Sequence, residues 1–229
     1  MKLSIIMPVF NEAKTIREII AKVMAVPLEK ELVIVDDCST DETAKILKGE
    51  YDGKIENIKV FYHEKNKGKA AAIKTGIPHT TGEIISIQDG DLETDPNDFI
   101  ALTEPIRKGE ASVVYGSRYL NPKEAHLYFS YQLGGRILSQ TVNLLYGQHI
   151  TDEPTCYKVF KAETLKSIKL EYDRFEFCPE VTAKVSKLGY KIKELPMNYY
   201  PRTFDEGKKV NWKDGVKALW VLFKFRFVN

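Results

Sequence analysis

The segment LSIIMPVFNEAKTIREIIAKVM, residues 3–24, contains the pattern that decides the fold class. Its first seven residues are mostly apolar, which is typical of a strand buried on both faces of a sheet. The apolar residues after it follow the spacing of one helix face: Ile16, Ile19, Ile20, Val23 and Met24. A buried strand followed by an amphipathic helix predicts the first unit of an α/β fold.

The same alternation continues to about residue 120. We predict strands at ELVIVDD (31–37), NIKVFYH (57–63), EIISIQ (83–88) and ASVVYGS (111–117). We predict helices at STDETAKILKG (39–49), GKAAAIKTGI (68–77) and PNDFIALTEPI (96–106). Strands and helices that alternate with short connections predict a mainly parallel sheet flanked by helices. The rhythm changes after residue 121, where we predict strands at CYKVF (156–160) and IKELPMNYY (192–200), a helix at PEVTAKVSKLG (179–189) and a final helix.

Composition narrows the class of protein. The chain has 229 residues, 43% hydrophobic and 29% charged, which fits a soluble globular protein and one domain over residues 1–229. Its three cysteines, Cys38, Cys156 and Cys178, form neither a disulfide framework nor a zinc pattern, so a reducing cytosol is expected. There is no apolar run of the length of a signal peptide or of a membrane span. The last 23 residues carry a net charge of +5, which predicts an anionic partner for the C-terminus.

Polar residues follow four of the predicted strands. They are Asn11 and Glu12, Asp36 and Asp37, Asp89 and Asp91, and Arg118. In such sheets, ligands bind outside the carboxyl ends of the strands. A polar residue at one strand end is usually just the beginning of a loop, but four such ends on one edge predict a binding site.

The stretch IISIQDGDLETD, residues 84–95, places four carboxylates directly after a buried strand. Asp89 and Asp91 flank Gly90, so the backbone can turn tightly while their side chains converge. Magnesium and manganese prefer oxygen ligands, often one or two carboxylates together with substrate phosphates. We therefore predict a site for Mg²⁺ or Mn²⁺ at the pair Asp89 and Asp91, with Glu93 either a third ligand or solvated. Asp95 is interpreted as a helix cap before Pro96.

The motifs SIIMPVFNEAKTI, LVIVDDCSTDET, NKGKAAAIKTGI and IQDGD together resemble the donor half of family-2 glycosyltransferases with the GT-A fold. In the second half, YGSRYL, GGRILSQTVN, TDEPTCYKVF and EGKKVNWKDGVKALW resemble the branch that glycosylates polyprenyl or dolichyl phosphate. The resemblance implies a Rossmann-like sheet, with residues 1–120 binding a nucleotide diphosphate sugar. Residues 121–229 would bind the acceptor and meet the membrane through amphipathic C-terminal helices.

The resemblance also implies roles for individual residues. The donor would contact Pro8, Val9, Phe10, Glu12, Asp37, Lys69, Gln88, Asp89 and Gly90. The catalytic residues would be Asp89, Asp91 and Asp152, and Asp91, with Glu93, would bind the cation on the diphosphate. Two alternatives are open: Asp37 as a cap for the helix of STDET, and Lys69 as a solvated side chain. Asp152 would act either as a base or as a group that orients an arginine or the sugar.

The acceptor phosphate would be bound by four cations: Arg118, Arg136, Arg202 and Lys209. Arginine suits this role because its planar fork donates two parallel hydrogen bonds to phosphate. Each of them could instead form a surface salt bridge. Arg136 is the most informative, because it is the only Lys or Arg in residues 125–151, a stretch without any acidic residue.

The final helix has an apolar stripe with lysines nearby: Trp212, Val216, Leu219, Trp220, Phe223 and Phe227. Such a stripe is usually core, but aromatic residues beside lysines also describe a helix lying in a membrane interface, the interpretation we favour here. The predicted enzyme is peripheral, acts at the cytoplasmic membrane face and inverts the configuration of the sugar. The sequence contains no QxxRW-type motif of processive synthases, which favours transfer of a single sugar. No nucleic acid is expected as a partner. The alternatives are a glycosyltransferase with a soluble or glycolipid acceptor, and a non-catalytic membrane-associated domain.

Overall fold

The computed structural model describes residues 1–121, 129–201 and 212–228. Its strands are β1 (Leu3–Val9), β2 (Lys30–Asp36), β3 (Ile58–Tyr62), β4 (Ile84–Ile87), β5 (Val113–Ser117), β6 (Lys158–Lys161) and β7 (Ile192–Pro196). Its α-helices are α1 (Ile16–Ala25), α2 (Thr43–Glu50), α3 (Lys69–Gly76), α4 (Asp98–Arg107), α5 (Phe129–Tyr146), α6 (Ala162–Lys166), α7 (Phe177–Lys187) and α8 (Trp212–Phe227). The described residues also contain two 3₁₀ turns, η1 (Ile77–His79) and η2 (Arg118–Leu120).

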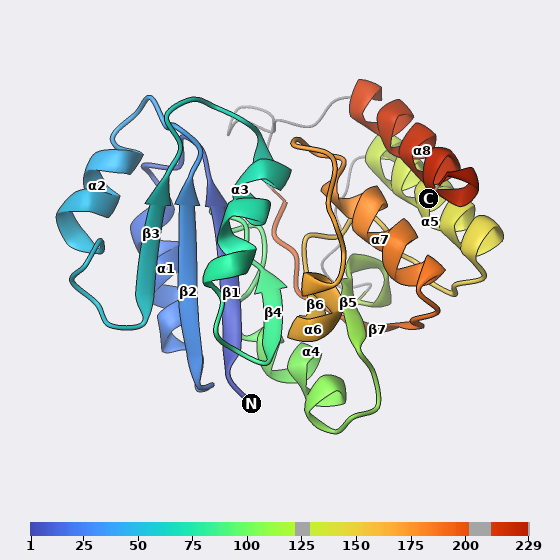
Figure 1. The fold of residues 1–229 in the computed structure, drawn as a ribbon, viewed down its shortest axis with the longest axis horizontal. Coiled ribbons are helices and arrows are strands. Elements are labelled where there is room, and N and C mark those ends of the chain that lie inside the picture. Colours follow the sequence, from blue (N-terminus) through green and yellow to red (C-terminus); the bar gives the residue numbers. More distant parts are fainter. Residues whose placement is uncertain (122–128, 202–211, 229) are drawn as a thin grey trace.

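All seven strands form one sheet in the order β3-β2-β1-β4-β6-β5-β7 (Figure 1). The pairs β1–β2, β2–β3, β1–β4 and β5–β7 are parallel, which confirms the mainly parallel sheet expected from the alternation of strands and helices. The exception is β6, which runs antiparallel to both of its neighbours, β4 and β5. The start of β6 therefore lies at the same edge of the sheet as the carboxyl ends of the parallel strands.

Helices cover both faces of the sheet, and each face has its own hydrophobic cluster. One cluster packs α1, α2 and α4 against the sheet, and the other packs α3, α5, α6, α7 and α8. Along β1, Leu3, Ile5 and Met7 belong to the first cluster while Ile6 belongs to the second, as the two-residue period of a strand requires. Helices α5, α7 and α8 lie together at one end of the molecule (Figure 1).

The apolar stripe predicted for the last helix is mostly exposed, so the alternative that the stripe is core does not hold for most of its residues. The residues of α8 that are buried are Ala218, Val221, Leu222 and Phe225. Four residues of the predicted stripe are exposed instead: Val216, Trp220, Phe223 and Phe227. Leu219 is half-buried, and the side chain of Trp212 lies outside the described residues. Among the helices that the structure describes, none is both long enough and apolar enough to cross a bilayer.

A buried carboxylate, that of Glu31 on β2, joins β1, β3 and the segment before β4 at the edge of the sheet opposite the predicted site. Glu31 Oε1 accepts hydrogen bonds from Ser4 Oγ at 2.6 Å and from the Thr81 backbone N–H at 2.5 Å. Glu31 Oε2 accepts one from Lys59 Nζ at 3.0 Å. Burial raises the pKa of Glu31, but these hydrogen bonds outweigh it and bring the pKa down to about 2.

We expect Glu31→Gln to lower the free energy of unfolding by about 2 to 3 kcal/mol at pH 7. The folded pKa is depressed from the usual value of 4.5, so this stabilisation is complete above about pH 4.5. It is lost as the pH falls toward 2, and the difference between wild type and variant should therefore shrink by more than half at pH 3. Urea unfolding at both pH values measures this. Glu18→Gln, on the exposed side of α1, is the matched control, and an equal cost at pH 7 and pH 3 would contradict the explanation.

Candidate active site

The acidic loop, residues 89–95, follows β4 directly, and a cation from α3 neutralises its first carboxylate. Lys69, the first residue of α3, places Nζ 2.6 Å from Asp89 Oδ1 and 2.7 Å from Oδ2. Burial lowers the pKa of Lys69, but the Asp89 carboxylate more than offsets this, so the pKa is raised overall. Lys69 is thus not simply a solvated side chain, and it reduces the repulsion expected within the acidic loop.

The next two carboxylates are held in place by the backbone and by a distant tyrosine. Asp91 Oδ1 accepts a hydrogen bond from the Glu93 backbone N–H at 3.2 Å, and Glu93 Oε2 accepts one from the Tyr199 hydroxyl at 2.9 Å. Leu92, between them, has a φ of +62°, a left-handed conformation that is unfavourable for a leucine. Strain of this kind persists where the surroundings enforce it, often at functional sites.

These side chains fit a hard divalent cation that shares its ligands with a substrate. Asp91 and Glu93 offer carboxylate oxygens, the donors that Mg²⁺ and Mn²⁺ prefer. In residues 1–121, 129–201 and 212–228, no group of three or more His, Cys, Asp and Glu side chains is arranged as a metal site. A cation here would therefore complete its coordination with diphosphate oxygens and water, as Mg²⁺ commonly does.

Gln88, which directly precedes the acidic loop, holds it through side-chain hydrogen bonds. Its side chain is fully buried, and its amide nitrogen donates to the Asp89 carbonyl and to Thr94 Oγ1, both at 3.0 Å. Its amide oxygen accepts a hydrogen bond from the Tyr157 hydroxyl at 2.7 Å. Gln88 was expected to contact the donor. All three of its side-chain hydrogen bonds are made to other residues of the protein, so the donor contact stays a prediction. The interpretation of Asp95 as a helix cap was wrong: its Oδ1 accepts a hydrogen bond from the Asn97 N–H at 3.0 Å in the turn before α4, and the N-cap residue of α4 is Asn97.

The loops after β1 and β2 are tied together beside the acidic loop. The Asn11 N–H donates to Ser39 Oγ at 2.9 Å, and the Thr40 N–H donates to Asn11 Oδ1 at 2.8 Å. A Cβ on Gly90 would lie 3.3 Å from Glu12 Cγ, so the two loops are in contact. The structure thus brings the expected donor segment, Pro8 to Glu12, against the acidic loop.

Asp37 anchors a third loop and does not cap α2. Its carboxylate accepts hydrogen bonds from the N–H groups of Lys67 at 2.9 Å and Gly68 at 2.7 Å, and contacts His63 Nδ1 at 2.6 Å. The helix-cap alternative for Asp37 was wrong, because Asp41 Oδ1 accepts from the Thr43 N–H at the start of α2. The adjacent Asp36 has a buried Oδ1 with no hydrogen-bond partner among the described residues.

On the acceptor side, Arg118 and Asp152 form a two-point ion pair. Arg118 Nε lies 2.7 Å from Asp152 Oδ2 and Arg118 Nη2 lies 2.7 Å from Oδ1, while the Arg118 backbone N–H also donates to Oδ2. Asp152 is fully buried and precedes β6, and the antiparallel direction of β6 is what brings it to this edge. Of the two alternatives for Asp152, this geometry supports the group that orients an arginine.

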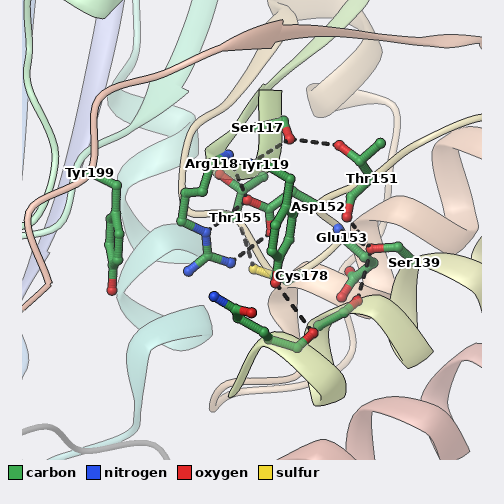
Figure 2. Close-up of polar contacts among 12 residues, drawn as sticks. Ser117, Arg118, Tyr119, Ser139, Thr151, Asp152, Glu153, Thr155, Cys178 and Tyr199 are labelled. Atoms are coloured by element: carbon green, nitrogen blue, oxygen red, sulfur yellow. Dashed lines mark hydrogen bonds and ion pairs between the residues drawn. The ribbon is translucent and has the colours of Figure 1, made fainter. Parts of the chain in front are cut away.

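The Arg118 guanidinium lies between Asp152 and the ring of Tyr199, 5.1 Å from the ring centroid (Figure 2). Arg136, on α5, is exposed. Burial and the Asp152 charge raise the pKa of Tyr119, and the charges of Arg118 and Arg136 oppose this rise. The other two expected cations, Arg202 and Lys209, lie outside the described residues.

Cys156 connects the two groups of charges. Burial raises the pKa of its thiol, Asp89 and Asp91 raise it further, and Lys69 and Arg118 oppose them. Tyr199 supplies a direct contact between the same two groups, because it meets both Glu93 of the acidic loop and Arg118. The acidic loop and the pair of Arg118 and Asp152 are therefore neighbours. No role was predicted for Cys156 or Tyr199, because each depends on residues that are distant in the chain.

The comparisons with known proteins identify the fold and the family. The crystal structure of Mycobacterium tuberculosis glucosyl-3-phosphoglycerate synthase with Mn²⁺, UDP and glucosyl-3-phosphoglycerate superposes with a TM-score of 0.70 at 18% identity, covering 100% of this chain and 81% of that one. The fold is thus that of the GT-A glycosyltransferases. The model of glycosyl transferase family 2 matches residues 4–169, and the chain belongs to this family.

Curated relatives extend the similarity beyond the family model. The chain is 28% identical over 241 residues to UDP-N-acetylglucosamine–dolichyl-phosphate N-acetylglucosaminyltransferase of Methanococcus voltae, covering 97% of this chain and 95% of the relative. It is 30% identical over 213 residues to dolichyl-phosphate β-glucosyltransferase of Trichomonas vaginalis, covering 86% of this chain. The chain spans 65% of the length of the Trichomonas relative.

Proposed function

We propose that this glycosyltransferase transfers one sugar, with inversion, from a UDP- or GDP-linked sugar to polyprenyl or dolichyl phosphate at the cytoplasmic membrane face. The chain would act as one catalytic unit, with residues 1–120 binding the donor and the remainder binding the acceptor. Family membership supports the reaction class. The names of the Methanococcus and Trichomonas relatives support a dolichyl phosphate acceptor.

In this proposal the donor occupies the edge formed by the loops after β1, β2 and β4. The unpartnered Asp36 Oδ1 would accept a hydrogen bond from the base or ribose, because an unsatisfied buried carboxylate oxygen is otherwise costly. Asp37 would hold the loop of residues 63–68 around the nucleotide. Asp91, with Glu93, would hold Mg²⁺ or Mn²⁺ against the diphosphate. When bound, the cation supplies positive charge that stabilises the leaving diphosphate.

The acceptor phosphate would be held by Arg118 and Arg136. Asp152 occupies Nε and Nη2 of Arg118, whereas Nη1 makes no hydrogen bond to a described residue and is available to phosphate. One acceptor oxygen would attack the anomeric carbon as the bond between that carbon and the diphosphate oxygen breaks, and the bonding pair leaves with the diphosphate. The acceptor is already ionised at neutral pH, so the reaction does not need Asp152 as a strong base.

The single observation that best supports a lipid acceptor is the exposed apolar patch of α8, defined here as Val216, Trp220, Phe223 and Phe227. Trp220 is 58% exposed and Phe227 is 80% exposed, on the helix side opposite the buried residues. Lys213, Lys217 and Arg226 are exposed on the same helix. Large apolar side chains among basic residues favour a helix that lies on an anionic bilayer surface.

We expect the double variant Trp220→Ser, Phe223→Ser to bind anionic phospholipid vesicles at least about 10-fold more weakly than wild type. Full burial of a large apolar side chain stabilises binding by about 1.5 to 3 kcal/mol, and a side chain that is only partly inserted into the membrane interface contributes a fraction of this. Co-sedimentation with vesicles measures the binding. Ile55→Ser removes a comparably exposed apolar side chain near β3, at the other end of the molecule, and should bind as wild type. Equal binding by all three proteins would contradict a role for α8 at the membrane.

The donor is identified by incubating the enzyme and a polyprenyl phosphate with labelled UDP- and GDP-linked glucose, mannose and N-acetylglucosamine in the presence of Mn²⁺. One donor should give a lipid-linked product, and the anomeric configuration of that product, read by NMR, should be opposite to that of the donor. Retention of configuration would overturn the inverting mechanism. Turnover that is unchanged when polyprenyl phosphate is omitted would favour a soluble acceptor.

A further inference from the structure

The segment that follows β7 crosses from the acceptor side of the site to the acidic loop. At one end, the Met197 N–H donates to the Ser117 carbonyl at 3.2 Å, next to Arg118. Further along, Tyr199 forms an antiparallel bridge with Thr94, and the Tyr200 N–H donates to the Glu93 carbonyl at 2.8 Å. The backbone of this short segment is therefore fixed to both halves of the site.

Tyr199 is the side chain of this segment that contacts both charged groups. It is only 6% exposed. Its hydroxyl donates to Glu93 Oε2 at 2.9 Å, and its ring faces the Arg118 guanidinium, 5.1 Å from the centroid to Cζ (Figure 2). A tyrosine hydroxyl carries its proton at neutral pH, so it can donate to the Glu93 carboxylate.

We infer that Tyr199 is a positioning residue with two separable actions, in which its hydroxyl orients Glu93 toward the cation and its ring orients Arg118 toward the acceptor phosphate. The inference rests on the proposed function, because it assigns Glu93 to the cation and Arg118 to the acceptor. It goes further by naming the side chain that makes the geometry of one substrate site depend on that of the other.

The physical basis is that contact with Tyr199 restricts the side-chain rotations of both Glu93 and Arg118. A carboxylate that binds a metal is usually held by an outer hydrogen bond, and losing such a bond typically costs about 10- to 100-fold in metal affinity. The ring acts differently, because the face of an aromatic ring attracts a guanidinium without using its N–H donors. Arg118 therefore keeps Nη1 for phosphate while Asp152 and Tyr199 fix its plane.

The test separates the hydroxyl from the ring with two substitutions. Tyr199→Phe removes the hydrogen bond to Glu93 and keeps the ring, whereas Tyr199→Leu removes both. Mn²⁺ binding is measured without acceptor, by the loss of the free Mn²⁺ EPR signal in the presence of UDP or GDP, whichever wild type binds. The acceptor KM is measured separately at saturating donor and Mn²⁺. Tyr51→Phe, which removes a hydroxyl at the end of α2, is the matched control.

We expect Tyr199→Phe to weaken Mn²⁺ binding about 10-fold and to leave the acceptor KM within about 2-fold of wild type. Tyr199→Leu should show the same loss of Mn²⁺ affinity and, in addition, an acceptor KM about 5-fold higher. Two results would overturn the inference: a Mn²⁺ affinity of Tyr199→Phe equal to that of wild type, or a rise in acceptor KM that is equal in both variants. These results count against the inference alone when wild type binds Mn²⁺ and Asp91→Asn does not. If wild type itself binds no Mn²⁺ with either nucleotide, the proposed function fails together with the inference.

Discussion

Asp91→Asn should lower kcat for sugar transfer by on the order of 10³-fold while the protein remains folded. Asn keeps the size of the side chain and an oxygen that can accept from the Glu93 N–H, so the turn of the acidic loop is preserved. It removes the negative charge that would bind the cation beside the leaving diphosphate. Removing one group that stabilises developing charge typically costs about 10²- to 10³-fold, and losing the cation adds to this cost.

Asp95→Asn is the matched control for Asp91→Asn, because it makes the same chemical change four residues later in the same loop. Asp95 accepts a hydrogen bond within the turn before α4, so its replacement should cost about 1 kcal/mol of stability and less than about 3-fold in kcat. Initial rates across a Mn²⁺ titration, with circular dichroism to verify folding, measure both variants. Similar losses of rate in the two variants would mean that the loop matters as a structure and that Asp91 has no special role.

Asp152→Asn should raise the acceptor KM by about 30- to 100-fold and lower kcat at saturating acceptor by less than about 5-fold. Asp152 accepts three hydrogen bonds from Arg118 in a fully buried position, whereas Asn has one oxygen and would turn an N–H group toward the guanidinium. Losing a buried charged partner costs about 2 to 3 kcal/mol, which here would appear as a misplaced Arg118.

The same variant separates an orienting group from a base. If Asp152 removed a proton during transfer, kcat would fall by at least about 10²-fold, and the lower limb of the pH profile would disappear. An orienting role leaves the pH profile of kcat unchanged and confines the loss to acceptor KM. Asp173→Asn, at an exposed ion pair with Lys74, is the control for the chemical change alone and should alter neither value more than about 2-fold. A large loss of kcat with an unchanged acceptor KM would contradict the orienting role.

The strands and most helices could be predicted from periodicity, because each face of the sheet buries apolar residues at a regular spacing. The direction of β6 could not, since a short strand that is buried on both faces has the same apolar pattern whichever way it runs. That direction decides where Asp152 lies. Its partnership with Arg118 was therefore open in the sequence and became visible only in the sheet.

The C-terminal helix shows a different limit of sequence patterns. Helix α8 is apolar around most of its circumference, so its sequence contains two stripes with helical spacing, and periodicity cannot tell which one faces the core. The buried stripe is Ala218, Val221, Leu222 and Phe225, and the larger aromatic residues are mostly outside. Tertiary packing against α5 and α7 makes this choice, which the sequence of α8 alone does not encode.

Within the site, the sequence indicated the carboxylates and arginines but not their partners. Tyr199 contacts Glu93, which is 106 residues away in the chain, and no local sequence pattern predicts this pair. Asp37 presents a similar case. Its position after β2 suggested either a donor contact or a helix cap, and its actual bonds are to the loop before α3.

The central claim, that a polyprenyl phosphate is the acceptor, is tested most directly by following labelled sugar into the organic phase. The labelled nucleotide sugar and Mn²⁺ are combined with polyprenyl phosphate in one reaction and with the unphosphorylated polyprenol of the same length in another. The account predicts lipid-linked label with the phosphate, and a signal at least about 10²-fold lower with the polyprenol. Equal label with both lipids, or none with either for every donor, would contradict it.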